Sequence, residues 1–204
     1  MRLATRRILT YLWLPTVLFN LASAASLLEG KQLTAALAGG GYVMLMRHAS
    51  SPETRPTSDQ AAPANPGRER QLDDSGRAKA RAMGEAFKHL QIPIGLVLSA
   101  PSYRTLETAR MAQLPDPHTY DDLGEPGRNA ERAASLRAQV ALVPDAGTNT
   151  VIITNYLNIA DAFATDAKDL AEGEALIYHP DGHGKAPLVA RVKIDDWPSL
   201  PAAR

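Results

Sequence analysis

Residues 42–49 have the sequence Tyr-Val-Met-Leu-Met-Arg-His-Ala. Five consecutive apolar residues, which follow three glycines and include an aromatic and a β-branched side chain, predict a strand that is buried on both faces. The strand ends in Arg47 and His48. Ligands of open α/β sheets bind at the carboxyl ends of the strands, so a guanidinium and an imidazole at this position suit phosphoryl chemistry. An isolated Arg-His pair is also compatible with a strand that simply ends in polar residues.

The first 24 residues have the features of a removable export signal. A mostly apolar run at 8–21 follows a basic start, and Ala-Ser-Ala at 22–24 offers a cleavage site of small residues. The run is short and contains a proline and an asparagine, so no stable membrane span is expected after the signal is removed. We expect a periplasmic or secreted protein with a general secretory signal; the alternatives are a twin-arginine signal and an uncleaved anchor. The basic residues are Arg2, Arg6 and Arg7.

Residues 25–204 form the predicted mature domain, and about 180 residues suffice for one domain with a substantial core. Loss of the three leader arginines lowers the count of Lys and Arg from 22 to 19, against 22 Asp and Glu. Proteins that bind nucleic acid carry a basic excess, so this class is not expected. The chain has no cysteine, which excludes disulfides and thiolate catalysis.

Alternating helical and strand patterns predict the fold class. Strand, helix, strand order implies right-handed parallel crossovers, and the turn at 180–182 implies an antiparallel hairpin. We therefore predict a three-layer α/β/α sandwich with a mainly parallel sheet and an antiparallel C-terminal addition, against which Trp197 packs the tail. Helices are expected at 27–37 and 129–143, with another that is capped by Asp73, Asp74 or Ser75 and runs to about residue 90. Further strands are expected at 94–99, 150–154, 175–178 and 188–194. The buried stripe of the third helix is predicted to comprise Ala133, Leu136, Val140 and Val143.

Residues 50–71 contain four prolines and almost no large apolar side chain, which predicts a long loop. Its arginines, Arg55, Arg68 and Arg70, could meet a charged substrate, but we expect them to be solvated surface charges.

A second candidate cation follows the strand at 94–99. Pro101 and Ser102 suit the start of a helix, which places Arg104 in its first turn. The helix dipole normally favours arginine at the opposite end. A bound anion would reverse this preference, because the free amide groups of a helix N-terminus bind phosphate. We therefore interpret Arg104 as part of an anion site.

Arg-His-Ala at 47–49 and Ser-Ala-Pro-Ser-Tyr-Arg-Thr-Leu-Glu-Thr-Ala at 99–109 together resemble the histidine phosphatase superfamily, which includes phosphoglycerate-mutase-like enzymes and small bacterial phosphohistidine phosphatases. The resemblance implies an exported phosphomonoesterase in which His48 accepts the phosphoryl group while Arg47 and Arg104 clamp its oxygens. It implies neither a metal nor another cofactor. The expected partner is a small phosphorylated substrate or phosphate.

The resemblance also implies a general acid in a loop after the third strand, in a Leu-x-Glu-x-x-Gly type setting. The segment Leu-Gly-Glu-Pro-Gly at 123–127 has a similar form, so Glu125 is the expected acid. Asp121 and Asp122 are neighbours that could replace it, and a plain surface carboxylate is the alternative.

Asn155 stands where the resembled family usually has a second histidine. Its amide can still donate to a phosphoryl oxygen, but it carries no positive charge and cannot exchange a proton. A single oxyanion donor can change the rate by roughly two or three orders of magnitude. Alternatively, Asn155 is a good N-cap for a helix that starts at Tyr156. A non-catalytic phosphate- or phosphoester-binding protein on the same fold is therefore the competing function.

His179, Asp181 and His183 could form a metal-ligand set. However, the Pro-Asp-Gly sequence between two predicted strands is a turn signal, so a hairpin is the expected structure.

Overall fold

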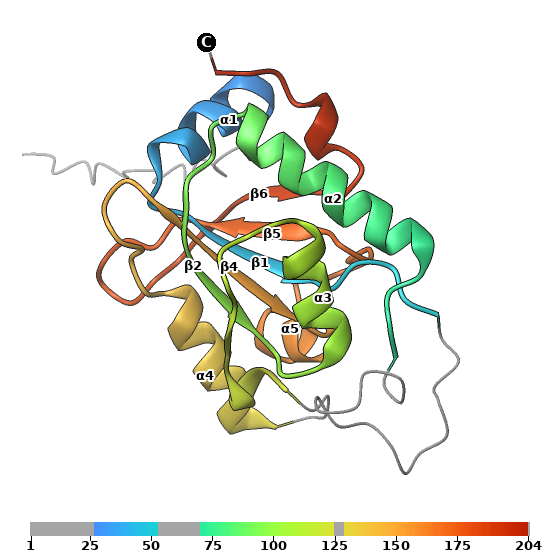
Figure 1. Cartoon of the computed structure of the whole chain (residues 1–204). Coiled ribbons are helices and arrows are strands. Elements are labelled where there is room, and N and C mark those ends of the chain that lie inside the picture. Colours follow the sequence, from blue (N-terminus) through green and yellow to red (C-terminus); the bar gives the residue numbers. More distant parts are fainter. Residues whose placement is uncertain (1–26, 53–69, 125–128, 204) are drawn as a thin grey trace, which may run out of the picture.

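The computed structural model describes residues 27–52, 70–124 and 129–203, which form one sheet flanked by helices (Figure 1). The helices are α1 (Gly30–Gly39), α2 (Asp74–His89), α3 (Tyr103–Met111), α4 (Ala130–Val140) and α5 (Tyr156–Ala162), with short 3₁₀ turns at Asp121–Leu123 and Trp197–Ser199. The strands are β1 (Val43–Arg47), β2 (Ile94–Ser99), β3 (His118–Thr119), β4 (Asn149–Thr154), β5 (Ala175–Tyr178) and β6 (Leu188–Val192). The predicted signal at 1–24 lies outside the described residues.

The sheet has the strand order β3-β2-β4-β1-β5-β6. Strand β4 pairs in parallel with both β1 and β2, whereas β5 is antiparallel to β1 and β6 is antiparallel to β5. This arrangement confirms the predicted parallel sheet with an antiparallel C-terminal addition. Because β1, β2 and β4 run in the same direction, their carboxyl ends meet at one edge of the sheet.

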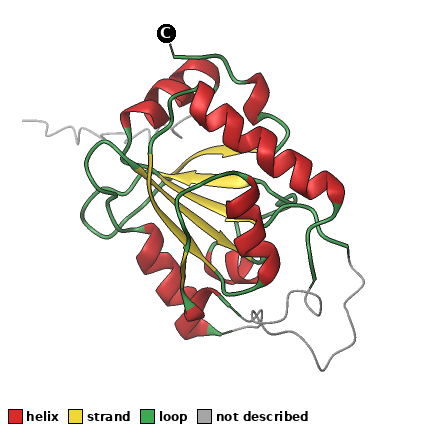
Figure 2. Ribbon diagram, viewed as in Figure 1, coloured by secondary structure: helices red, strands yellow, loops and turns green. Residues whose placement is uncertain are grey.

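Two apolar cores lie on the two faces of the sheet. Successive strand residues point to opposite faces, so Met44 and Met46 enter one core while Val43 and Leu45 enter the other. Helices α1, α2 and α3 contribute to the first core, and α4 and α5 contribute to the second (Figure 2). The predicted three-layer architecture is therefore confirmed.

Two helix starts illustrate what local patterns predict well and badly. Helix α2 begins as expected, because the Asp73 side chain accepts a hydrogen bond from the Gly76 amide at 2.6 Å. Helix α1 begins at Gly30, three residues later than predicted. The reason is that Leu28 donates its amide to Val189 O at 2.7 Å and Glu29 has extended dihedral angles, so the chain is still paired with the sheet there.

The C-terminal end of α4 differs from the prediction. The helix ends at Val140, and Leu142 and Val143 are 59% and 57% exposed. Pro144 disfavours helical dihedral angles at the residue before it, so the chain leaves the helix before Val143 can join the buried stripe. Ala133, Leu136 and Val140 are buried as predicted.

The C-terminal elements complete the body as expected. Trp197 is fully buried and packs edge-on against Phe87, with ring centroids 4.7 Å apart. Asp181 Oδ1 accepts the amides of His183 and Lys185 at 2.7 and 3.0 Å, which closes the predicted hairpin. Within the described residues no three His, Asp or Glu side chains lie close enough to hold a metal ion. No described helix is long and apolar enough to span a bilayer.

Candidate active site

His48 follows β1 directly, at the edge where the parallel strands end. Its amide donates to Thr154 O at 3.1 Å, and the Gly173 amide donates to His48 O at 2.9 Å, so the backbone is held by β4 and by the turn before β5. The side chain is 4% exposed, and its Nδ1 lies 2.8 Å from Ala49 O. A carbonyl oxygen can only accept, so Nδ1 carries the proton and Nε2 holds the lone pair. Nε2 is therefore the nitrogen available for attack.

The surroundings keep the His48 imidazole neutral. Burial is the main cause and lowers its pKa from 6.5 to about 3. The positive charges of Arg104, Arg47 and Arg70 lower the pKa further, while the hydrogen bond to Ala49 opposes the shift. A neutral imidazole that is influenced by three guanidinium charges suits attack on an anionic phosphoryl group.

Arg47 is the last residue of β1, and its guanidinium is held on two sides. Nη1 donates to Leu170 O at 3.2 Å, and Nη2 lies 3.0 Å from Glu172 Oε1. The Tyr156 ring centroid lies 5.6 Å from Cζ. The buried Nε has no hydrogen-bond acceptor among the described residues, so it is available to donate to a ligand oxygen.

Arg104 lies in the first turn of α3, as expected from the sequence. Its Nη2 donates to Asn155 Oδ1. Thr108 Oγ1 donates to Arg104 O at 2.8 Å and accepts from the Ala49 amide at 3.1 Å, which ties α3 to the segment after His48. Thr108 therefore fixes the helix that carries Arg104 relative to the segment that follows His48.

Arg70 is a site residue that sequence reasoning missed. It is half-buried, its Nη2 donates to Ser51 O at 3.0 Å, and its charge acts on His48. Ser51 Oγ donates to Gln71 O at 2.7 Å, and the Leu72 amide donates to buried Glu107 at 3.3 Å, so this part of the chain is anchored. The expectation of a solvated charge was therefore wrong for Arg70, whereas Arg55 and Arg68 lie outside the described residues.

Asn155 connects the clamp to the loop before Glu125. It is 4% exposed; its Oδ1 accepts from Arg104 and its Nδ2 donates to Gly124 O at 3.1 Å. Asn155 holds the N-cap position of α5, but its side chain makes no capping hydrogen bond, so the predicted capping contact is absent. Asn158 supports the same loop by donating to Leu123 O at 2.7 Å.

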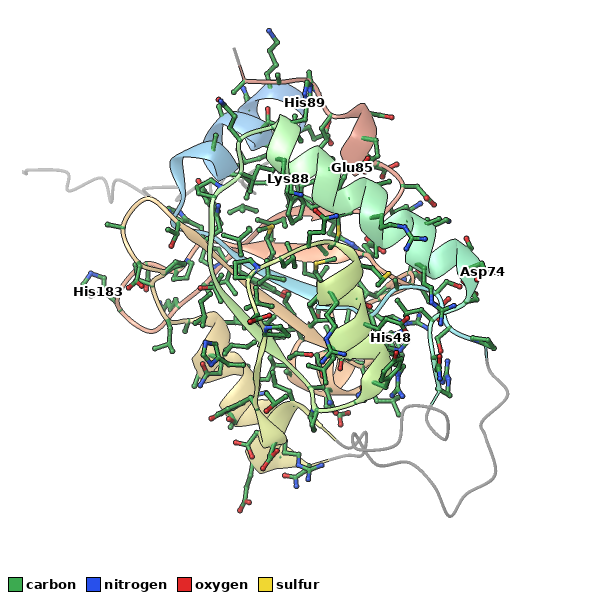
Figure 3. The ribbon with its side chains drawn as sticks, in the orientation of Figure 1. His48, Asp74, Glu85, Lys88, His89 and His183 are labelled. Atoms are coloured by element: carbon green, nitrogen blue, oxygen red, sulfur yellow. The ribbon has the colours of Figure 1, made fainter. Side chains whose placement is uncertain are left out.

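The acidic candidates lie around this loop. Glu125 lies outside the described residues. Asp121 is exposed, and Asp122 Oδ2 accepts a hydrogen bond from Ser135 Oγ at 2.8 Å. His183 lies across the molecule from His48 (Figure 3), so the hairpin histidine is remote from this edge of the sheet.

The part of the chain that carries His48 and the three arginines matches a known family. Residues 43–141 match the family model described as the histidine phosphatase superfamily, branch 1. This match confirms the resemblance to the superfamily that was found in the sequence. Asn155 and Glu172 lie beyond the matched residues. No curated protein sequence matches the chain.

Solved structures share the fold at low sequence identity. The protein histidine phosphatase SixA, solved with tungstate, is 18% identical with a TM-score of 0.57, and the alignment covers 76% of this chain and 98% of that one. A putative phosphohistidine phosphatase SixA from Agrobacterium tumefaciens is 16% identical with a TM-score of 0.54. That alignment covers 74% of this chain and 97% of the other. Bacillus stearothermophilus YhfR is 16% identical with a TM-score of 0.54, and the alignment covers 73% of this chain and 95% of that one. These similarities establish the fold.

Proposed function

We propose that this chain is a phosphomonoesterase that acts through a phosphohistidine on His48. The observation that carries the proposal is the neutral, buried imidazole with a free Nε2 lone pair, whose pKa is lowered by the charges of three arginines. The tungstate bound by the SixA structure supports it, because tungstate is a tetrahedral oxyanion of the same shape as phosphate. A small phosphorylated molecule is the proposed partner.

The proposed reaction has two steps. Nε2 of His48 attacks phosphorus, the P–N bond forms, and the P–O bond to the leaving alcohol breaks as an acid donates a proton to that oxygen. Water then attacks phosphorus, the P–N bond breaks, and inorganic phosphate leaves. Arg47, Arg70 and Arg104 neutralise the equatorial oxygens, on which negative charge is spread in the transition state. We keep Glu125 as the proposed acid, because Asn155 and Asn158 hold the residues just before it.

A specific observation favours the competing function, which is phosphate binding without turnover. The Asn155 amide uses its oxygen on Arg104 and a hydrogen of Nδ2 on Gly124 O. Asn155 thus contributes to the site by orienting Arg104, and it supplies no positive charge to the phosphoryl group. A site without that charge can retain its anion affinity while hydrolysis is slow.

The two functions are separated by assaying phosphomonoester hydrolysis with the wild type, His48→Ala and Asn155→His. We expect slow hydrolysis by the wild type, none by His48→Ala, and an increase for Asn155→His. Restoration by Asn155→His of an activity absent from the wild type would favour the binding protein. Undiminished activity of His48→Ala would contradict the assigned nucleophile.

We also propose that the enzyme works in the periplasm or outside the cell, on the basis of the basic start, apolar run and small-residue site at 1–24. N-terminal sequencing of the protein recovered from the periplasm should begin at Ala25. A protein that keeps Met1 and stays with the membrane fraction would support an uncleaved anchor instead.

A further inference from the structure

A carboxylate lies directly beside the phosphate clamp. Glu172 Oε1 is 3.0 Å from Arg47 Nη2, and the Glu172 side chain is 31% exposed. A site built to hold only a phosphate dianion would gain from leaving Arg47 unopposed, because a nearby negative charge repels the ligand. The position of Glu172 therefore needs a reason within the proposed phosphatase reaction, on which this inference rests.

The chain holds Glu172 at this edge through a tight turn. The Glu174 amide donates to Ala171 O at 3.2 Å, and Gly173 has a positive φ of 72°, which closes the turn around Glu172. The Gly173 amide also donates to His48 O at 2.9 Å. Glu172 is thus three residues before β5, and the residue after it is linked through the backbone to His48.

Glu172 differs from its neighbour Glu174. Glu174 is 3% exposed, pairs with Arg191 at 2.8 Å and accepts the Ala171 amide at 2.8 Å, which are the contacts of a structural residue. Glu172 is partly open to solvent and shares Arg47 with an aromatic ring. Its carboxylate can therefore accept a further hydrogen bond from a ligand.

An exposed apolar surface also lies next to Arg47. Tyr156 is 37% exposed, with its ring centroid 5.6 Å from Arg47 Cζ, and Leu157 beside it is 50% exposed. Aromatic rings attract cations, and a carboxylate with an aromatic ring is a combination that suits an alkylammonium group. Arg47 contacts both Glu172 and Tyr156, so a phosphoryl group on Arg47 would have both within reach.

We propose that Glu172 is a specificity-determining residue and that the enzyme prefers zwitterionic phosphomonoesters, in which an alkylammonium group lies a few bonds from the phosphoryl group. The phosphoryl group occupies the arginine clamp, and the ammonium group lies against the Glu172 carboxylate and the Tyr156 ring. The negative charge of Glu172, which repels a phosphoester without an ammonium group, then attracts the ammonium group of the bound substrate.

The test compares 2-aminoethyl phosphate with 2-hydroxyethyl phosphate, which are similar in size and differ in the ammonium charge. The kcat/KM of each ester is measured for the wild type, Glu172→Gln and Glu85→Gln, an exposed control on α2 far from His48 (Figure 3). We expect Glu172→Gln to lower the ratio of amino to hydroxy ester about fivefold, the size of a partly exposed charge pair. Comparing the ratio between proteins cancels the different reactivity of the two leaving groups.

Glu85→Gln should leave the ratio unchanged. An unchanged ratio in Glu172→Gln would overturn the proposal, and so would an equal change for both esters, because that result means that Glu172 only positions Arg47. If the wild type hydrolyses no phosphomonoester at all, the proposed phosphatase function fails. In that case calorimetry measures the binding affinity of each ester, and the ratio of the two affinities in the wild type and in Glu172→Gln tests the role of Glu172 separately.

Discussion

His48 shows how three neighbouring side chains and burial set the state of one residue. The imidazole is 4% exposed and is tied by Nδ1 to a backbone carbonyl, so its proton is on one defined nitrogen. Burial and the charges of Arg47, Arg70 and Arg104 keep its pKa far below the usual value. A residue in this state does not serve as a cation at neutral pH, which suits the proposed role of His48 as a nucleophile.

The pKa of His48 predicts how stability depends on pH. It falls from 6.5 in the unfolded chain to about 3 in the folded one, so the unfolded chain binds more protons between these values. The free energy of unfolding should therefore fall as the pH drops below the unfolded value, by up to about 1.4 kcal/mol per pH unit. Urea unfolding at about pH 7 and about pH 5 should show a smaller loss for His48→Asn than for the wild type. Equal losses would contradict the assigned pKa.

Arg70 should contribute to anion affinity. Its charge acts on His48, and its buried Nε has no hydrogen-bond acceptor among the described residues. Arg70→Ala is expected to weaken tungstate binding about tenfold to a hundredfold, as for loss of a hydrogen bond to a charged group. Calorimetry with Arg110→Ala, an exposed arginine of α3, provides the control. Equal tungstate affinities of the two variants would remove Arg70 from the site.

The sequence predicted the site residues that follow regular elements. Arg47 and His48 end an apolar strand and Arg104 enters the first turn of a helix, so periodicity and capping signals place them. Arg70 and Glu172 lie in irregular segments, where no hydrophobic periodicity indicates which way a side chain points. Their positions depend on partners far along the chain, such as Glu107 for the segment of Arg70 and Arg47 for Glu172.

At the scale of elements, the position of Arg104 depends on how α3 packs against α2. Gly84 of α2 faces the C-terminal end of α3, and a Cβ at Gly84 would lie 1.9 Å from Ala112 O. The two helices can approach this closely only because Gly84 has no side chain. Tight packing of α3 together with the Thr108 contacts fixes the helix that presents Arg104.

Gly84→Ala should therefore separate the two helices. We expect a loss of about 1–3 kcal/mol in the free energy of unfolding, as for overpacking, together with weaker tungstate binding. Gly39→Ala is the matched control, because a Cβ there meets nothing within 4 Å. Urea unfolding and calorimetry measure both effects. A Gly84→Ala protein as stable as the Gly39→Ala protein would contradict the packing described.

Element boundaries show the limit of local patterns. The start of α2 follows from the Asp73 cap, whereas the start of α1 depends on pairing of Leu28 with distant Val189. Val143 continued a helical stripe in the sequence, yet the following proline ends α4 earlier. The start of α1 therefore differs from its prediction because of a contact with a distant strand, and the end of α4 differs because a proline overrides the apolar pattern.

The whole molecule brings the site together at one edge of one sheet. Strand β1 carries Arg47 and His48, β2 leads into α3 with Arg104, and β4 leads into Asn155. The antiparallel strand β5 begins at the same edge and brings Glu172 there. Parallel topology thus explains why residues from distant segments meet at one edge of the sheet, and why the fold was predictable from the order of its elements.

The phosphoryl-enzyme is the most direct test of the central claim. The mature protein is mixed with a phosphomonoester, quenched with base within the first turnover, digested and analysed by mass spectrometry. We predict an acid-labile phosphoryl group on the peptide that contains His48, formed before free phosphate is released and absent from His48→Ala. Substrate turnover without any phosphorylated His48 peptide would contradict the mechanism.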